Sequence, residues 1–224
     1  NAPSVTIMKD FKIDNKGSGR LFSSSFLERL TRTHFLFPVI LYYLAAISCV
    51  GYAIYETSIS FLRFWWLFVP GMLLFSLVEY LIHRFLFHFN AKSPAELQLQ
   101  YNIHGIHHEF PRDKDRLVMP PVVSIVVASL FGYCFYFLMG GNGWILFGGF
   151  LAGYSTYLVI HYSVHARRPP DNFLRYWWKH HSRHHYASVH SAFAVSMPLW
   201  DFVFGTMPPK SDTGRSGATD DQHS

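Results

Sequence analysis

The stretch FWWLFVPGMLLFSLVEYLIHRFLFH, residues 64–88, joins a long apolar run directly to two histidines. As a helix, Phe64–Ile82 is long enough to cross a hydrocarbon layer that is about 30 Å thick. Pro70 and Gly71 lie inside this run, and membrane helices tolerate both residue types. His83 and His88 follow where the run ends. The stretch therefore predicts a membrane-spanning helix that ends at a histidine-bearing polar site.

The composition agrees with a membrane protein. Of the 224 residues, 50% are hydrophobic and only 15% are charged, whereas a soluble domain typically carries about 25% charged residues. Lys and Arg outnumber Asp and Glu by 19 to 14, which gives a formal net charge of +5. In a membrane protein this excess indicates cytoplasmic loops beside anionic lipid, so we expect no nucleic-acid partner.

Further apolar runs of membrane-spanning length predict four spans in two hairpins, with the additional spans at residues 35–55, 121–139 and 144–160. Basic residues precede the first span, lie between the second and third, and follow the fourth, whereas the two opposite connectors contain only Arg63. The positive-inside rule therefore predicts that both termini and the 83–118 loop are cytoplasmic. All the clustered histidines then lie on one side of the membrane.

This organisation predicts three parts along the chain. Residues 1–33 are expected to form a cytoplasmic N-terminal segment, residues 34–207 the membrane domain, and residues 208–224 a disordered polar tail rich in Ser, Thr, Gly and Asp. The expected fold class is all-α and integral to the membrane, with four transmembrane helices and a cytoplasmic helical cap.

The cap is expected to carry a histidine-rich dimetal site. Its ligands would be four clusters, namely His83 and His88; His104, His107 and His108; His161 and His165; and His181, His184 and His185. Residues three and four apart share one face of a helix, so most of each cluster can converge. His83 and His88 are five apart, so we expect them to diverge somewhat and to reach two different metals. Ten imidazoles exceed what one ion can bind, which predicts two ions.

The ligand type leaves the metal open, because imidazole suits Zn, Cu, Fe and Ni. Soluble di-iron bundles use Glu and Glu-x-x-His ligands, and this sequence has no such carboxylate set.

The order HxxxxH, HxxHH, HxxxH and HxxHH resembles the fatty acid hydroxylase superfamily. Three stretches are more narrowly similar to the fatty acid 2-hydroxylases that act on sphingolipid acyl chains: EYLIHRFLFH at residues 79–88, DKDRLVMPP at 113–121 and WDFVFGT at 200–206. The resemblance implies an O₂-dependent monooxygenase that adds a hydroxyl at carbon 2 of a fatty acyl chain, such as that of a ceramide. It also implies two iron ions held by the ten clustered histidines, for which zinc can substitute in purified protein.

The resemblance implies a membrane lipid substrate and an electron donor. Residues 1–33 are too short for the cytochrome b5 domain that several eukaryotic members carry, so we expect a separate donor, such as cytochrome b5 or ferredoxin with its reductase. This favours the bacterial cytoplasmic membrane, with the endoplasmic reticulum membrane as the location in a eukaryote. Ligands at the cytoplasmic ends of the spans lie near headgroup depth, which suits carbon 2.

Two acidic residues outside the histidine clusters each have two possible roles. Glu79 either hydrogen-bonds a ligand histidine or pairs with Arg84 at the interface, and Asp201 either supports a ligand or caps a helix. We expect no metal-binding role for His180, which points about 100° away from His181 on a helix. His190 is either an extra polar group near the site or a surface residue, and we favour the surface position; His34 and His223 are expected to be bystanders.

Three alternatives stay open. A sterol or acyl desaturase, or a sphingoid-base desaturase or hydroxylase, would share the histidine pattern. A zinc-dependent membrane hydrolase would bind zinc with these side chains, although such enzymes usually keep an open position beside three ligands. A metal transporter would place its ligands near the membrane midplane rather than at one end of the spans.

Overall fold

The computed structural model describes residues 12–209, and these residues form helices and turns without a strand. Residues 1–11, and the expected polar tail from residue 210 onward, lie outside the described residues. The elements in chain order are α1 (Ser25–Leu30), α2 (Leu36–Glu56), α3 (Phe61–Leu81), η2 (Ile82–Phe87), α4 (Pro94–Gln100), η3 (Tyr101–Gly105), α5 (Ile106–Glu109), η4 (Lys114–Arg116), α6 (Pro121–Met139), η5 (Gly140–Asn142), α7 (Gly143–Ala166), α8 (Arg175–Tyr186) and α9 (Leu199–Val203).

Three continuous stretches of the described chain are long and apolar enough to cross a membrane: Leu36–Glu56, Phe61–Phe87 and Lys114–Ala166. The last stretch contains both α6 and α7, which η5 separates, so the third and fourth expected spans are two helices here. Many of their large apolar side chains face outward, as a lipid solvent requires; Ile47 is 67% exposed and Phe137 75%. α7 extends six residues beyond the expected end of its span, from 160 to Ala166.

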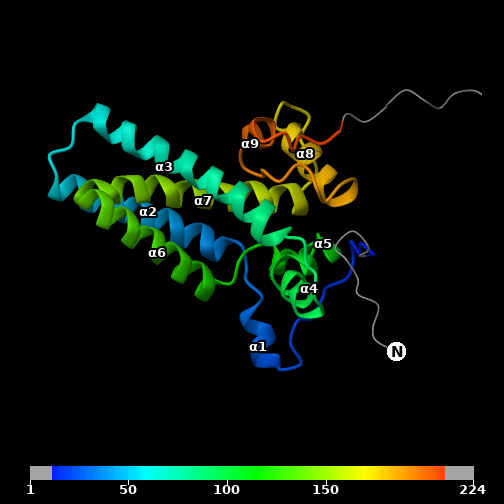
Figure 1. Cartoon of the computed structure of the whole chain (residues 1–224). Helices are drawn as coiled ribbons and strands as arrows, with labels where there is room; N and C mark the ends of the chain where they lie inside the picture. The colour runs from blue at the N-terminus through cyan, green and yellow to red at the C-terminus, as the bar shows by residue number, and fades with distance from the viewer. Residues whose placement is uncertain (1–11, 210–224) are drawn as a thin grey trace, which may run out of the picture.

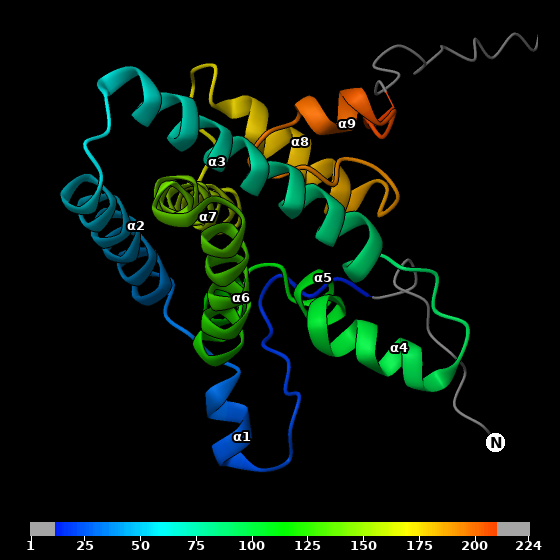
Figure 2. The same cartoon turned by 60° about the vertical axis from the view of Figure 1, so that its left-hand side comes forward.

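α7 is the central helix of the bundle and packs against α2, α3 and α6 (Figures 1 and 2). Glycines permit the closest approach between α3 and α7. A Cβ placed on Gly149 would lie 2.0 Å from the Phe68 carbonyl oxygen, and one on Gly71 would lie 2.2 Å from the Leu146 carbonyl oxygen. Small residues at such contacts bring helix backbones together in membranes, where apolar burial contributes little to helix association.

The short helices gather at one end of this bundle (Figure 1), where α4 and α5 lie on one side and α8 and α9 on the other. α7 and η2, the continuation of α3, run into this cap. His165 of α7 lies beside His107 of α5 and His181 of α8. His88, at the end of η2, lies beside His108 of α5 and His184 of α8. The expected cap at one end of the spans is present.

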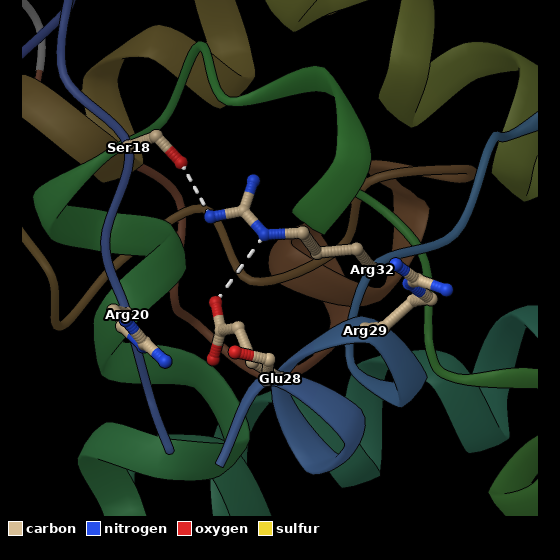
Figure 3. Close-up of a pocket in the computed structure, with 6 residues that line it drawn as sticks. Ser18, Arg20, Glu28, Arg29 and Arg32 are labelled. Atoms are coloured by element: carbon tan, nitrogen blue, oxygen red, sulfur yellow. Dashed lines mark hydrogen bonds and ion pairs between the residues drawn. The ribbon is translucent and has the colours of Figure 1, made fainter. Parts of the chain in front are cut away.

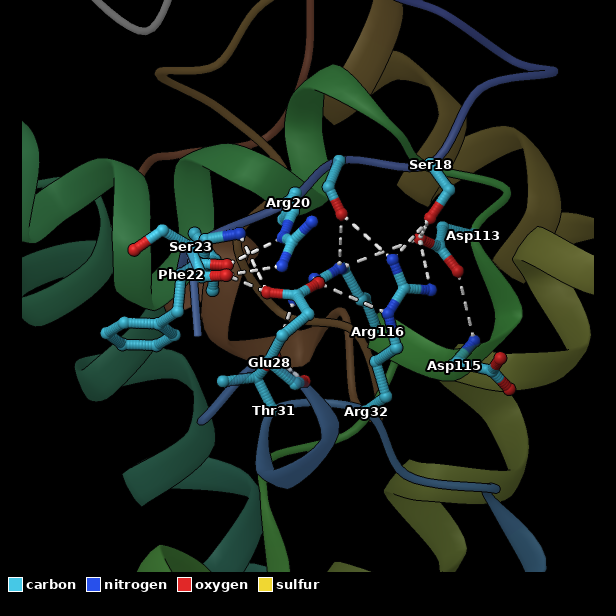
Figure 4. Close-up of polar contacts among 12 residues, drawn as sticks. Ser18, Arg20, Phe22, Ser23, Glu28, Thr31, Arg32, Asp113, Asp115 and Arg116 are labelled. Carbon is cyan, nitrogen blue, oxygen red and sulfur yellow. Dashed lines mark hydrogen bonds and ion pairs between the residues drawn. The ribbon is translucent and has the colours of Figure 1, made fainter. Parts of the chain in front are cut away.

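The motif at residues 113–121 holds the N-terminal segment against the cap. Arg116 is buried and bonds to the Glu28 carboxylate and to the Gly19 carbonyl oxygen, the latter at 3.1 Å. The Ser18 hydroxyl donates to Asp113 at 2.5 Å (Figure 4). Arg32 lies between Ser18 and Glu28, on one wall of a pocket of about 540 Å³ (Figure 3). A buried arginine requires this dense set of partners, because an unpaired buried charge is strongly destabilising.

The close contact at Gly149 makes a specific prediction for packing. Gly149→Ala should lower the free energy of unfolding by about 1–3 kcal/mol, the usual cost of overpacking, because the Phe68 backbone cannot move aside as a side chain can. Thermal unfolding in detergent would measure this loss as a lower Tm. Gly51→Ala is the matched control, since a Cβ there meets nothing within 4 Å. Equal Tm values for the two variants would contradict the packing argument.

Candidate metal centre

Two π-helical turns carry histidines into the cap. The backbone of α3 continues into the π-helix η2, and the His88 amide donates to the His83 carbonyl oxygen five residues back, at 3.1 Å. Residues five apart therefore lie on one face here, as residues four apart do in an α-helix. The expectation that His83 and His88 diverge toward different metals is wrong, because both belong to one group. His104 lies on the second π-turn, η3, and such turns often mark functional sites.

The clustered histidines form two groups that could each hold a metal ion. Within each group the facing ring nitrogens lie within 4.8 Å of one another. The first group is His83, His88, His104, His108 and His184; the second is His107, His161, His165 and His181. Adjacent residues of α5, His107 and His108, supply one ligand to each group, so the two groups are neighbours.

His185 lies between the groups rather than in either. Its Nε2 is 3.1 Å from the Nε2 of His181, and its ring stacks on that of His108 with centroids 4.3 Å apart. Nine of the ten expected ligands are thus divided five and four, and the tenth contacts both groups.

The ring nitrogens face one another in a way that fits a shared cation. The Nδ1 atom of His83 lies 2.5 Å from the Phe193 carbonyl oxygen, and that of His184 lies 2.8 Å from the Ser191 carbonyl oxygen. A carbonyl only accepts, so each Nδ1 donates and each Nε2 of a neutral ring presents a lone pair. The Nε2 of His83 faces that of His104 at 3.1 Å, and the Nε2 of His184 faces that of His88 at 3.0 Å.

The second group has the same arrangement. The Nδ1 atom of His161 donates to the Leu117 carbonyl oxygen at 3.0 Å, and the Nε2 atoms of His165 and His181 face each other at 2.8 Å. Both ring nitrogens of His107, and Nδ1 of His181 and His185, are buried without a hydrogen-bond partner among the described residues. Such buried polar atoms are uncommon, and an ion in the second group would give one nitrogen of His107 a partner.

Burial keeps these imidazoles neutral. It lowers the pKa of His104, His107 and His108 well below the usual range, and neighbouring imidazoles add to this effect. The same causes lower the pKa of His181 and His185. Neutral imidazole is the form that binds a metal. The donor set therefore fits two neighbouring transition-metal ions.

The two expected supporting carboxylates do not contact the clustered histidines. Glu79 accepts the Val195 amide at 2.7 Å and bonds to the amide and hydroxyl of Ser196. It is buried and does not pair with Arg84, whose guanidinium instead donates to the Tyr80 hydroxyl. Glu79 therefore holds the 193–196 loop.

Asp201 holds the other end of the same loop. It accepts the amides of Phe193 and Ala194, each at 2.9 Å, and the Thr206 hydroxyl at 2.7 Å. The loop carries the Phe193 carbonyl oxygen, which accepts from His83. Asp201 therefore orients a clustered histidine through the backbone rather than directly.

Sequence reasoning missed His180, whose Nε2 lies 2.8 Å from Asp201. His180 points away from the two histidine groups and toward the Asp201 carboxylate. The spacing of residues along a helix gives no indication of this contact. His34 and His190 are exposed, although His190 also lines a pocket beside His88, and His223 lies outside the described residues.

The position of Asp201 makes a testable prediction. Asp201→Asn keeps the side-chain shape but turns one acceptor into a donor that faces backbone N–H groups. We expect the metal affinity of the five-histidine group to fall about 10–100-fold, the usual loss when an orienting partner is removed. Metal analysis of protein purified with its native metals should then show about two ions per chain in the unaltered protein and fewer in the variant.

Asp171→Asn is the matched control, because the Asp171 side chain is 93% exposed. Full metal content in Asp201→Asn, together with an unchanged Tm, would show that the loop does not depend on this carboxylate.

Comparisons with known proteins agree with this geometry. The model of the fatty acid hydroxylase family matches residues 68–206. The rat fatty acid 2-hydroxylase is 43% identical over 148 residues, which are 64% of this chain and 40% of that protein. A dihydroceramide fatty acyl 2-hydroxylase of Arabidopsis thaliana is 33% identical over 84% of this chain and 80% of its own length. The solved structure of full-length scs7p, in which only the hydroxylase domain is visible, superposes on this chain with a TM-score of 0.80 at 33% sequence identity. The match covers 89% of this chain and 76% of the scs7p chain. The chain therefore spans two fifths of the rat relative and most of the plant one, and it belongs to the fatty acid hydroxylase family.

Proposed function

We propose that the chain is an O₂-dependent, di-iron membrane hydroxylase that adds a hydroxyl at carbon 2 of a lipid acyl chain, such as that of a ceramide. The two facing groups of neutral histidines carry the metal part of this proposal. The names of the relatives, which include fatty acid 2-hydroxylases and a dihydroceramide fatty acyl 2-hydroxylase, support the substrate and the carbon.

All ten clustered histidines are the proposed ligands. The five-histidine group would hold one ion, the four-histidine group the other, and His185 lies where it can complete the second. Imidazole does not distinguish iron from zinc, so the choice of iron rests on the family. Bound iron would supply the activation of O₂ that no side chain can provide.

The reaction uses O₂, two electrons and two protons. One oxygen atom replaces a hydrogen on carbon 2 as a hydroxyl, and the other leaves as water. We propose that the electrons come from a separate donor, such as cytochrome b5 or ferredoxin with its reductase. The part of the protein is to hold the metals, to place the acyl chain beside them and to exclude bulk water from the buried histidines.

We propose four membrane spans, formed by α2, α3 with η2, α6 and α7. The cap, both termini and the 83–118 loop would be cytoplasmic, because the basic residues gather on that side while Arg63 alone lies on the other. The proposed location is the bacterial cytoplasmic membrane, or the endoplasmic reticulum membrane in a eukaryote. Cap histidines near the headgroups would reach carbon 2 more easily than a deep methylene.

The activity is testable in whole cells. A host that expresses the chain with a compatible electron donor should gain acyl chains with one added oxygen at carbon 2, which lipid mass spectrometry would detect. His107→Ala should abolish this product while the protein stays in the membrane, because both ring nitrogens of His107 are buried in the second group. His34→Ala should retain the activity, since His34 is exposed and lies outside the cap groups.

Other products would move the chain to another branch of the family. A new double bond, or a hydroxyl on a sterol or a long-chain base without a 2-hydroxyacyl product, would refute the proposed substrate position. Full activity in His107→Ala would refute the metal assignment.

The orientation in the membrane is separately testable with single cysteines. In a variant without Cys49 and Cys134, Lys92→Cys should react with an impermeant thiol reagent only after the membrane is opened. Ser58→Cys, in the connector between α2 and α3, should react from outside intact cells. Both positions are exposed in the structure, so a difference in labelling cannot come from burial of one of the two cysteines. External labelling at Lys92→Cys would overturn the topology.

A further inference from the structure

A second pocket opens beside the five-histidine group. It has a volume of about 420 Å³, and its walls combine apolar rings with polar side chains: Arg84, Phe85, His88, Phe89, Asn90, His190, Phe193 and Thr206. His88 is a member of the five-histidine group, so the pocket reaches the metal centre directly. A cavity with a few polar groups at one place and apolar walls elsewhere suits a ligand that is itself part polar and part apolar.

Arg84 is held in place by a chain of three hydroxyl and carboxylate contacts. Its guanidinium donates to the Tyr80 hydroxyl at 2.7 Å, which lies 3.0 Å from the Thr206 hydroxyl. Thr206 donates its only proton to Asp201, so the Tyr80 hydroxyl must donate to Thr206 and can accept from Arg84. The proton directions along the chain are therefore fixed, and they orient the guanidinium.

The guanidinium retains donors for another partner. Its carbon lies 5.0 Å from the centre of the Phe85 ring, and no carboxylate of residues 12–209 lies within ion-pair distance of it. Arginine has five N–H donors and no acceptor. An arginine without an acidic partner, fixed at the wall of a pocket beside a metal group, is suited to an oxygen acceptor of a ligand.

Exposed aromatic rings lie at and near the pocket, where Phe85 lines its wall. Phe85 is 60% exposed, and Phe204, which stacks on Tyr80, is 44% exposed. Exposed aromatic rings of this kind at the end of a membrane helix face the interface between headgroups and acyl chains. A lipid that enters from the membrane side would pass these rings.

We propose that Arg84 binds the carbonyl oxygen of the amide-linked acyl chain and thereby selects carbon 2. The inference rests on the proposed function and names the residue that would set its position. Carbon 2 is bonded directly to the carbonyl carbon, so a carbonyl held at Arg84 makes carbon 2 the first methylene beyond the polar contact. His88 lies four residues after Arg84 on the wall of the same pocket, and the rings of Phe85, Phe89 and Phe193 line the path of the chain.

Purified holoenzyme, supplied with its electron donor and an N-acyl sphingoid base that carries no phosphate, would test the proposal. Arg84→Gln should lower kcat/KM about tenfold or more, because it removes a charged hydrogen bond. Part of the remaining product should carry the hydroxyl beyond carbon 2. Arg84→Lys should restore part of kcat/KM, and Tyr80→Phe should cause a smaller loss than Arg84→Gln, since it removes only the orienting hydroxyl.

Arg112→Gln controls for the loss of a positive charge near the cap, because Arg112 is exposed and does not line the pocket. The iron content of every variant shows whether a lower kcat/KM reflects weaker substrate binding or a loss of folded, iron-loaded protein. Unchanged kcat/KM and product position in Arg84→Gln would overturn the proposal, as would losses in all variants that only follow lost iron. In a parallel assay with a matched phosphate-bearing lipid, a loss confined to that lipid would also overturn the proposal and would assign Arg84 to the headgroup. If the unaltered enzyme made no 2-hydroxyacyl product, the proposed function itself would fail.

Discussion

The arrangement of neutral, buried imidazoles around two points is the constraint on which the rest of the cap depends. Four ring nitrogens among His107, His181 and His185 lack a partner in the described residues. Each buried polar atom without a hydrogen bond costs about 1–3 kcal/mol, so together they cost about as much as the net stability of a typical domain, roughly 5–15 kcal/mol. An ion binds only one nitrogen of a ring, so it would satisfy one nitrogen of His107 but not Nδ1 of His181 or His185, whose Nε2 atoms face the neighbouring histidines. If the proposed ions are bound, we therefore expect them to stabilise the cap at His107.

The stretches at residues 79–88, 113–121 and 200–206 each hold one part of the histidine groups in place. Glu79 and Asp201 hold the two ends of the 193–196 loop, and the loop holds His83. In the 113–121 motif, Arg116 holds the N-terminal segment, while the Leu117 carbonyl next to it accepts from His161. Each metal group is thus oriented by a backbone carbonyl whose own position depends on a buried charged residue. Residues that bind no metal can for this reason be as important as those that do.

The sequence predicted much of the fold and most of the histidines that the structure brings together in the candidate site. Apolar runs located the long helices, and the spacing of His104, His107 and His108 indicated a common face. The spacing argument failed at His83 and His88 because it assumed an α-helix, whereas η2 is a π-helix in which residues five apart align. It also missed the contact between His180 and Asp201, which lie 21 residues apart in the chain. Local periodicity reports the direction of a side chain on its own helix, but not what another segment places there.

Asp201 connects the metal group to the neighbouring pocket. Through Phe193 it positions His83, and through Thr206 and Tyr80 it orients Arg84. A C–H bond is hydroxylated only where the acyl chain and the metal are held in a fixed relation, since a small misplacement has a large effect on the rate. In the proposed reaction, Asp201 would support both a metal ligand and the arginine that holds the substrate, and would thereby keep the two in a fixed relation. A shift of the 193–196 loop would therefore move His83 and the pocket wall at Phe193 together, so the proposed selection of carbon 2 by Arg84 would also depend on the position of this loop.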